Sequence, residues 1–195
     1  MFNLTPLFRA DARLFELIHI RWHDPWWQTF FNGLTWLGNA AVLLALVMPL
    51  LFWIERERFV ALSLALGLTL AVGGLSVQAL KHTIDRPRPA QHFGERMRLA
   101  PGTPRHRGSF PSGHANTVFA AATFLWAIRR GLGGALFSVA FLVGFSRVYV
   151  GAHYPADVVA GAALGILVGW IAIKLWKRKM EPDDDADHHP DVQRI

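Results

Sequence analysis

The sequence predicts an all-α membrane protein, a polytopic bundle of about five spanning helices preceded by one amphipathic helix, six in all. Of its 195 residues, 52% are hydrophobic and only 17% are charged, against roughly 25% charged in an ordinary soluble domain. The apolar residues also gather in runs long enough to cross a bilayer, which needs about 20 mostly apolar residues per helix. These observations disfavour a small soluble enzyme and rule out an intrinsically disordered chain, except at its C-terminal end.

The first expected element is an amphipathic helix over residues 7–22, lying in the membrane interface. Leu14, Ile18 and Trp22 recur at helical spacing with charged residues between them, as in helices that rest on a membrane surface. Those charges disfavour a spanning helix here, and the stretch lacks the continuous apolar core of a signal peptide.

Five apolar runs follow, and each is expected to span the membrane: 33–54, 59–80, 112–128, 132–150 and 155–176. Residues 1–179 are accordingly expected to form one integral-membrane domain. Residues 180–195 are acidic and without apolar periodicity, so we expect a disordered tail on the cytoplasmic side.

The charge balance and the cysteine count narrow the chemistry. The formal net charge is +6, which suits contact with anionic headgroups of membrane lipids. Nucleic acid is not an expected partner, because no soluble basic face is present. The chain has no cysteine, which excludes disulfides, thiolate catalysis and Cys-ligated metals. The oligomeric state is not indicated.

If the helices alternate in direction, three polar segments fall on one side of the membrane: 81–110, 111–114 and 146–157. The short loops holding Arg56, Arg58, Arg129 and Arg130 fall on the other side, with the basic cluster after Lys174. The positive-inside rule makes that other side cytoplasmic. We therefore expect a multi-pass protein of the cell inner (cytoplasmic) membrane whose polar segments face the extracytoplasmic side.

The first polar motif is Lys81 followed by Arg88-Pro89. Two prolines two residues apart prevent a helix from continuing and hold Arg86 and Arg88 in extended backbone. Cations fixed where a helix leaves the membrane suit an anionic ligand, although a basic cap that reaches to lipid headgroups would look the same.

The second motif, Pro111-Ser112-Gly113-His114, runs directly into the third apolar run. The first turn of a helix offers free N–H groups to a phosphate. Gly113 permits close backbone approach, Ser112 adds a hydroxyl, and His114 can donate a proton. An ordinary Ser N-cap beside a chance His is the alternative.

The third motif is Ser146-Arg147, then His153, then Asp157. Pro155 suits the first turn of the last helix, which would place Asp157 where its side chain can reach back to His153 and orient it. An oriented imidazole has one ring nitrogen free to attack. Arg147, near a helix end in a membrane, calls for an anionic partner. Together the three motifs fit phosphoryl transfer through a phosphohistidine, with cations and backbone donors stabilising the transferred charge.

At these residues the sequence resembles the type 2 phosphatidic acid phosphatase superfamily, whose motifs K-x6-RP, PSGH and SR-x5-H-x3-D are all matched. The resemblance implies an integral-membrane lipid phosphatase that works without a metal or other cofactor. It implies His153 as nucleophile, Asp157 as its orienter and His114 as general acid. It further implies a phosphate cradle of Lys81, Arg88, Ser112, Gly113 and Arg147. Vanadate-dependent haloperoxidases share the motifs on soluble folds, which five membrane helices argue against.

The substrate is expected to be a lipid phosphate or diphosphate. The short chain with its interfacial helix resembles small bacterial undecaprenyl-diphosphate phosphatases, which makes undecaprenyl diphosphate the first expectation. Phosphatidylglycerophosphate, phosphatidic acid and lipid A stay open, as does transfer to an acceptor lipid. The arginines of the long loop would hold a second phosphate or meet headgroups: Arg86, Arg96, Arg98, Arg105 and Arg107. A phospholipid binder or transporter without hydrolysis is the alternative from a different class.

Overall fold

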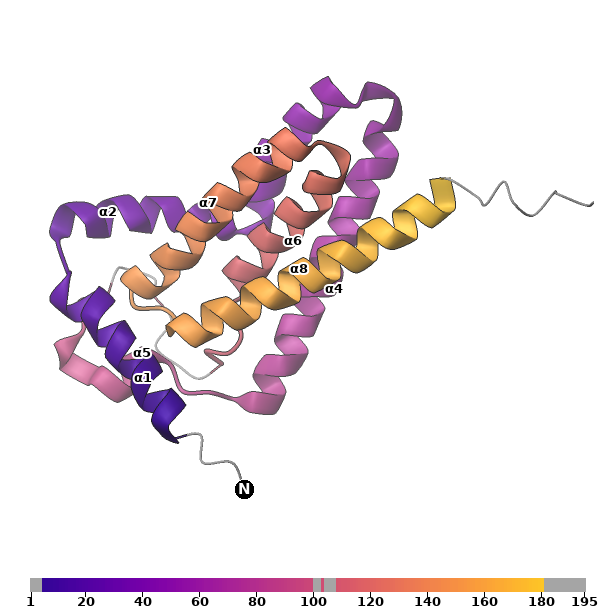
Figure 1. Ribbon diagram of the computed structural model, residues 1–195. Helices are drawn as coiled ribbons and strands as arrows, with labels where there is room; N and C mark the ends of the chain where they lie inside the picture. The colour runs from indigo at the N-terminus through magenta and orange to yellow at the C-terminus, as the bar shows by residue number, and fades with distance from the viewer. Residues whose placement is uncertain (1–4, 100–102, 104–107, 181–195) are drawn as a thin grey trace, which may run out of the picture.

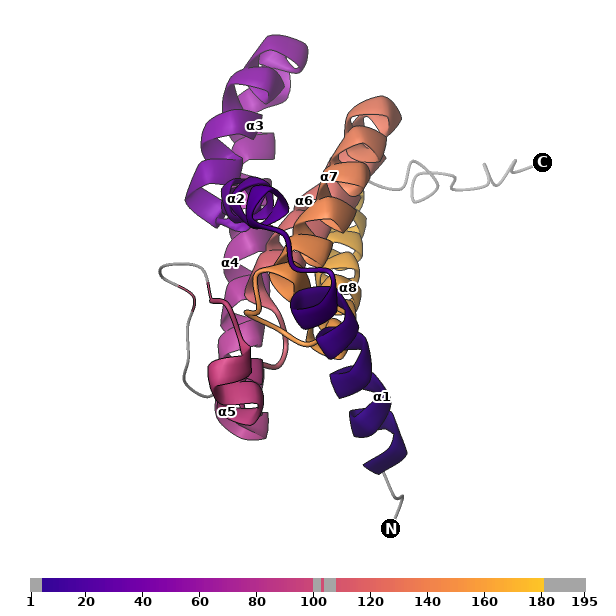
Figure 2. The same cartoon turned by 90° about the vertical axis from the view of Figure 1, so that its left-hand side faces the viewer.

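The structure is a computed structural model that describes residues 5–99, 103 and 108–180. Throughout these residues the regular elements are helices, so the expected all-α bundle is confirmed (Figure 1). The long helices lie side by side, with the α3–α4 hairpin on one side of the other three (Figure 2). They are α3 (Ala40–Ile54), α4 (Phe59–Ile84), α6 (Gly113–Ile128), α7 (Arg130–Tyr149) and α8 (Pro155–Met180).

Helix α6 is the centre of the bundle and packs along both α7 and α8. Its small side chains make this close approach feasible, since Ala120, Ala121 and Ala122 are all fully buried. On α8, Gly165 and Gly169 face α6 so closely that a Cβ atom on Gly169 would lie 2.7 Å from the Ala120 carbonyl oxygen. The two helices therefore meet backbone to backbone, as small residues allow in membrane bundles.

Each of the five expected spans corresponds to a helix, although their lengths differ from the expectation. Within the described residues, three stretches are long and apolar enough to cross a membrane on their own: Arg56–Arg96 with α4, Arg130–Tyr149 with α7, and Pro155–Arg178 with α8. Helix α6 has 16 residues and is shorter than these. Counting one bent pair as a fourth span, the chain is a multi-pass membrane protein.

That bent pair replaces the continuous run expected over 33–54. Helix α2 (Pro25–Leu34) and the 3-10 turn η2 (Thr35–Gly38) meet α3 at 70°. The break comes at Asn39, whose backbone is extended and whose side-chain oxygen accepts a hydrogen bond from Ala41 N at 2.9 Å. An Asn N-cap starts a new helix, and hydropathy alone does not detect it because the flanking residues are apolar.

The N-terminal segment forms helix α1 (Thr5–Phe15) and a π-helical turn η1 (Glu16–Arg21), where the amphipathic helix was expected. Its outer face is apolar and exposed, with Leu7 and Phe8 more than half exposed. Its inner face buries Phe15, which stacks on Phe93 at 5.1 Å between ring centroids and meets Tyr154 at 5.5 Å. Helix α1 is therefore part of the folded protein as well as an interfacial element.

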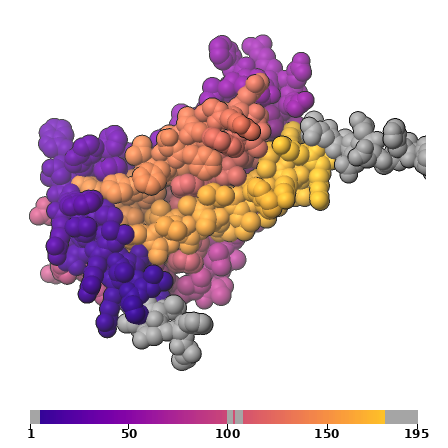
Figure 3. Space-filling model, viewed as in Figure 1, coloured from indigo at the N-terminus to yellow at the C-terminus, as the bar shows by residue number. Residues whose placement is uncertain are grey.

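Helix α1 and the short helix α5 (Pro89–Phe93) gather at the end of the bundle where α4 ends and α8 begins (Figures 1 and 2). In the space-filling view α1 lies against the first turns of α8 (Figure 3). At the opposite end α8 continues to Met180. The predicted tail, apart from that residue, lies outside the described residues and stays a prediction.

Candidate active site

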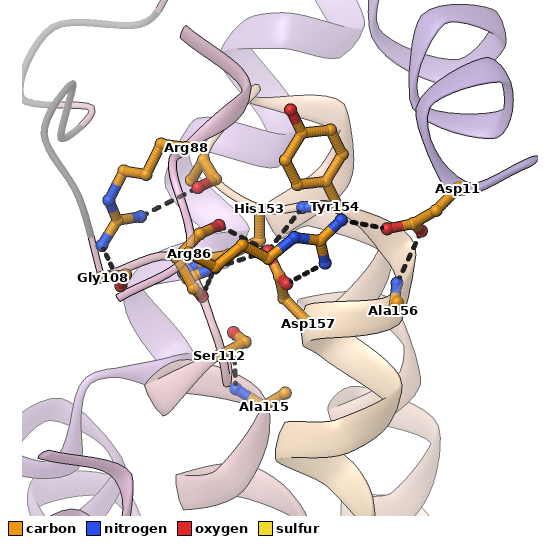
Figure 4. A network of polar contacts seen from close by, with 12 residues as sticks. Asp11, Arg86, Arg88, Gly108, Ser112, Ala115, His153, Tyr154, Ala156 and Asp157 are labelled. Atoms are coloured by element: carbon orange, nitrogen blue, oxygen red, sulfur yellow. Dashed lines mark hydrogen bonds and ion pairs between the residues drawn. The ribbon is translucent and has the colours of Figure 1, made fainter. Parts of the chain in front are cut away.

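The three polar motifs, far apart in sequence, meet at this covered end of the bundle. Arg88 of the first motif donates from Nη1 to the carbonyl oxygen of Ala152, next to His153, at 2.8 Å. Ser112 of the second donates its backbone N–H to the carbonyl oxygen of Asp157 at 2.9 Å. The structure therefore brings residues of all three motifs together, and Figure 4 shows Arg88, Ser112, His153 and Asp157 among them.

His153 is buried, with 2% of its surface exposed. Its Nδ1 lies 2.7 Å from the carbonyl oxygen of Ser109, and because a carbonyl only accepts, Nδ1 carries the proton. In a neutral imidazole the other nitrogen, Nε2, then keeps its lone pair. Burial lowers the pKa of His153 to about 4, the positive charges of Arg147 and Arg88 act in the same direction, and Asp157 opposes them. The ring is therefore neutral at pH 7, as a nucleophile must be.

We expected the side chain of Asp157 to reach back and hold His153, but its contacts in the structure are different. Its Oδ2 lies 3.7 Å from His153 Nδ1, too far for a hydrogen bond. Instead Oδ1 accepts from Arg86 at 2.5 Å, and Oδ2 accepts from the Ser109 hydroxyl at 2.5 Å and from Tyr154 N at 2.9 Å. The Ser109 carbonyl orients the imidazole, while Asp157 acts on it through its charge.

The expected cations lie around the histidine with part of their hydrogen-bonding capacity unused. Arg88 and Arg147 are only 6% and 8% exposed. Arg147 donates from Nη1 to Thr35 at 2.7 Å, and Arg88 also donates from Nη2 to the Gly108 carbonyl at 3.2 Å. Within the described part of the chain, the buried Nε atoms of both arginines have no partner. Buried donors without an acceptor are costly, and an anion between them would supply the acceptor.

Three other residues predicted for the site lie near the N-terminus of α6. Lys81 lies beside Gly108, so that a Cβ atom there would be 3.8 Å from Lys81 Cδ. Ser112 is fully buried, and its hydroxyl accepts a hydrogen bond from Ala115 N at 3.5 Å. This contact is the helix N-cap role that the sequence offered as the alternative to phosphate binding. His114, half-buried, has its ring against Gly38, where a Cβ atom would come within 2.7 Å of it. Only glycine fits there.

Three residues of this site were not predicted from the sequence, namely Thr35, Ser109 and Asp11, and the role of Arg86 differs from the prediction. Arg86, offered as a ligand for a second phosphate, instead pairs with Asp11 and Asp157. Arg96 pairs with Glu16 at 2.6 Å, whereas Arg105 and Arg107 lie outside the described residues. The one available signal was Asp11 itself, an acid on a helix otherwise bordered by basic residues.

The residues that the structure describes contain no group of three or more His, Cys, Asp or Glu side chains placed to hold a metal ion. The side chains that converge on His153 are instead cationic, and the ligand that they suit is an anion.

Comparison with known protein families agrees with this geometry. The family model described as the PAP2 superfamily matches residues 62–181, a stretch that contains all three motifs, most of α4, and α6, α7 and α8. The chain belongs to the PAP2 superfamily. The resemblance drawn from the motifs is thereby confirmed.

Curated PAP2 relatives include the lipid A 4'-phosphatase of Bacteroides thetaiotaomicron, 31% identical over 158 residues, which cover 76% of this chain and 69% of that protein. The lipid A 1-phosphatase of Rhizobium etli is 41% identical over 112 residues, which cover 54% of this chain. The chain spans only 45% of the Rhizobium protein's length. Other matches are named undecaprenyl-diphosphatase, from Sulfolobus acidocaldarius, and phosphatidylglycerophosphatase B, from Bacillus subtilis.

Among solved structures, Aquifex aeolicus LpxE aligns with a TM-score of 0.67 at 32% identity, covering 83% of this chain and 93% of that one. A Bacillus subtilis PAP2-type phosphatidylglycerolphosphate phosphatase aligns with a TM-score of 0.73 over 93% of this chain and 90% of that one. At 24% identity the second likeness shows the fold alone. The expected enzyme class, a PAP2 membrane lipid phosphatase, is confirmed at this level.

Proposed function

We propose that this PAP2 protein hydrolyses a lipid phosphate without a metal ion, through a phosphohistidine formed on His153. The observation that carries the proposal is the hydrogen bond from His153 Nδ1 to the Ser109 carbonyl. It assigns the proton to Nδ1 and leaves Nε2 with the lone pair that attacks phosphorus.

In the first step Nε2 of His153 forms a bond to phosphorus while the bond from phosphorus to the lipid oxygen breaks. His114, which the negative charge of the bound phosphate helps to protonate, gives its proton to that leaving oxygen. The imidazole gains positive charge as the bond forms, and the carboxylate of Asp157, 3.7 Å from Nδ1, stabilises that charge. The unpartnered Nε groups of Arg88 and Arg147, with Lys81, bind the phosphoryl oxygens.

In the second step water attacks phosphorus and the bond from phosphorus to Nε2 breaks. His114, now neutral, accepts a proton from that water, and inorganic phosphate leaves. His153 returns to its neutral form with the proton still on Nδ1, so both histidines regain their starting states. The same chemistry with a lipid hydroxyl in place of water would give transfer to an acceptor.

For the substrate, we place lipid A phosphate first and undecaprenyl diphosphate second. Arg86 and Arg96, two of the loop arginines expected either to hold a second phosphate or to meet headgroups, are each paired with a carboxylate. Among the described residues, Lys81, Arg88 and Arg147 gather beside His153, and these three cations suit one phosphoryl group. The PAP2 relatives named lipid A phosphatases support this order.

We also propose that residues 1–179 form one domain in the cytoplasmic membrane, with the site on the extracytoplasmic side and the end of α8 in the cytoplasm. The chain has no cysteine, so a single introduced cysteine reports its own accessibility. Glu95→Cys, exposed near the site, should react with a membrane-impermeant maleimide on intact cells. Glu57→Cys, exposed at the opposite end, should react only after lysis, and the reverse pattern would contradict this orientation.

The activity test is phosphate release by purified protein in detergent with EDTA, from lipid A, undecaprenyl diphosphate, phosphatidylglycerophosphate and phosphatidic acid. His153→Ala should abolish release, whereas His82→Ala, an exposed histidine next to Lys81, should leave it unchanged. Loss of activity in EDTA that returns with a divalent metal would contradict the metal-independent mechanism. Normal turnover by His153→Ala would contradict the phosphohistidine.

A further inference from the structure

Asp11 is a buried carboxylate on an amphipathic helix whose other charged residues face outward. Its side chain is 6% exposed. One oxygen accepts the backbone N–H of Ala156 in the first turn of α8 at 2.9 Å, and the other pairs with Nη2 of Arg86 at 2.6 Å. Helix α1 is therefore tied to the start of α8 and to the segment after α4.

Arg86 continues the chain of contacts toward the reacting histidine. Its Nη1 pairs with Asp157 at 2.5 Å, and its guanidinium lies over the ring of Tyr154 at 4.2 Å. The close-up shows the guanidinium extended between the two carboxylates, with Asp11 on the far side and Asp157 on the side of His153 (Figure 4). One side chain thus links the N-terminal helix to the carboxylate that faces the nucleophile.

A second ion pair also joins the N-terminal segment to the segment after α4, but its side chains are much more exposed to water. Glu16 and Arg96 lie 2.6 Å apart, but their side chains are 28% and 59% exposed. An exposed pair contributes little because water screens it. Removing a charge from water, by contrast, costs desolvation free energy. Asp11 and Arg86 are largely removed from water next to the site, so the fold bears that free-energy cost there.

We propose that Asp11 and Arg86 are positioning residues for the phosphatase reaction, holding Asp157 in place and setting the charge that it presents to His153. The proposal rests on the proposed function, since it assigns His153 as the nucleophile. Helix α1 then contributes to the active site, although it lies outside the matched family region of residues 62–181.

The charge balance gives the proposal a direction that can be measured. Asp11, Arg86 and Asp157 together carry one net negative charge beside His153, which favours the cationic ring formed during attack. The other groups that act on His153 are Arg88 and Arg147, which are positively charged, and His114, which is titratable. If Asp11 loses its charge, Arg86 is no longer balanced, and the cationic ring becomes less favourable.

The test is Asp11→Asn, which keeps an oxygen for Ala156 N, removes the charge and turns an amide group toward the Arg86 guanidinium. We expect kcat to fall about 10- to 100-fold, the range for a misplaced catalytic group, with KM changed by less than about threefold. The acidic limb of the pH profile should move to lower pH. Arg86→Gln should move that limb to higher pH, because it removes a positive charge. Adding Asp11→Asn to Arg86→Gln should have little further effect, since coupled residues are not additive.

Glu16→Gln is the matched control, because it breaks the exposed pair between the same regions and should leave kcat and the pH profile unchanged. Thermal unfolding in detergent should be recorded for every variant. An Asp11→Asn protein with the kcat and pH profile of Glu16→Gln would overturn the proposal. So would lower thermal stability with an unshifted pH profile, which would make Asp11 purely structural. Failure of the phosphohistidine itself would show separately, as turnover by His153→Ala.

Discussion

The effect of Asp157→Asn on turnover can be estimated from the geometry of the site. The carboxylate lies 3.7 Å from His153 Nδ1, and two unit charges at that distance interact by about 4 kcal/mol at an effective dielectric constant of about 20. Arg86, paired with the other carboxylate oxygen, offsets part of this attraction. If about 3 kcal/mol remains when the ring becomes cationic, kcat falls about 100-fold.

The variant also changes hydrogen bonding in a defined way. An Asn oxygen can still accept from Ser109 and Tyr154 N, but its amide group then faces the Arg86 guanidinium, donor against donor. The Ser109 carbonyl remains on His153 Nδ1, so the nucleophile keeps its tautomer. We therefore expect a lower kcat with residual activity above that of His153→Ala.

Phosphate release under saturating substrate is the assay, with Asp24→Asn as the matched control. Asp24 caps α2 through Trp26 N at 2.8 Å, and Asn caps as well as Asp, so that variant should behave as the parent. A kcat for Asp157→Asn within about twofold of the parent would refute the charge-stabilisation argument.

Three further predictions follow from single contacts. Burial lowers the pKa of His153 to about 4. Because only the neutral ring attacks, the acidic limb of the pH profile of kcat/KM should centre near pH 4. A limb centred near pH 6.5 would contradict a buried ring flanked by cations. Arg147→Lys loses the donor to Thr35 and should lower kcat/KM about tenfold or more, since a charge-assisted hydrogen bond is worth about 1.5–3 kcal/mol; Arg129→Lys is the control, and equal rates for the two variants would remove Arg147 from the cradle. Gly165→Ala should lower the free energy of unfolding by about 1–3 kcal/mol, because its Cβ would press on the Asn116 carbonyl. Thermal unfolding checks this against Gly67→Ala, which has open space; equal melting temperatures would contradict the backbone contact.

The parts of the site that the sequence predicted are those that chain topology forces together. Hydropathy locates the helices, and their alternation brings 81–89, 111–114 and 146–157 to one end without knowledge of packing. Arg147 was identifiable because a cation near a membrane helix end needs an anionic partner, and Arg88 because two prolines fix it where a helix leaves the membrane. The arrangement found around His153 agrees with that logic.

The parts that could not be predicted depend on tertiary contacts with no local pattern. Asp11 and Arg86 are 75 residues apart in sequence, and an acid on an interfacial helix ordinarily faces water. Ser109 contributes a backbone carbonyl to His153, and any residue type supplies one. The bend at Asn39 depends on one side-chain cap inside an apolar run. Because the hydropathy of that run is continuous, it gives no sign of the bend.

The most direct test of the mechanism is to look for the phosphoenzyme itself. Purified protein mixed briefly with substrate should be quenched in alkali, in which phosphohistidine survives, digested and analysed by mass spectrometry. We expect an acid-labile phosphoryl group on the peptide that contains His153, more abundant in variants with slowed hydrolysis and absent from His153→Ala. Phosphate on another residue, or turnover by a His153→Ala protein, would contradict it.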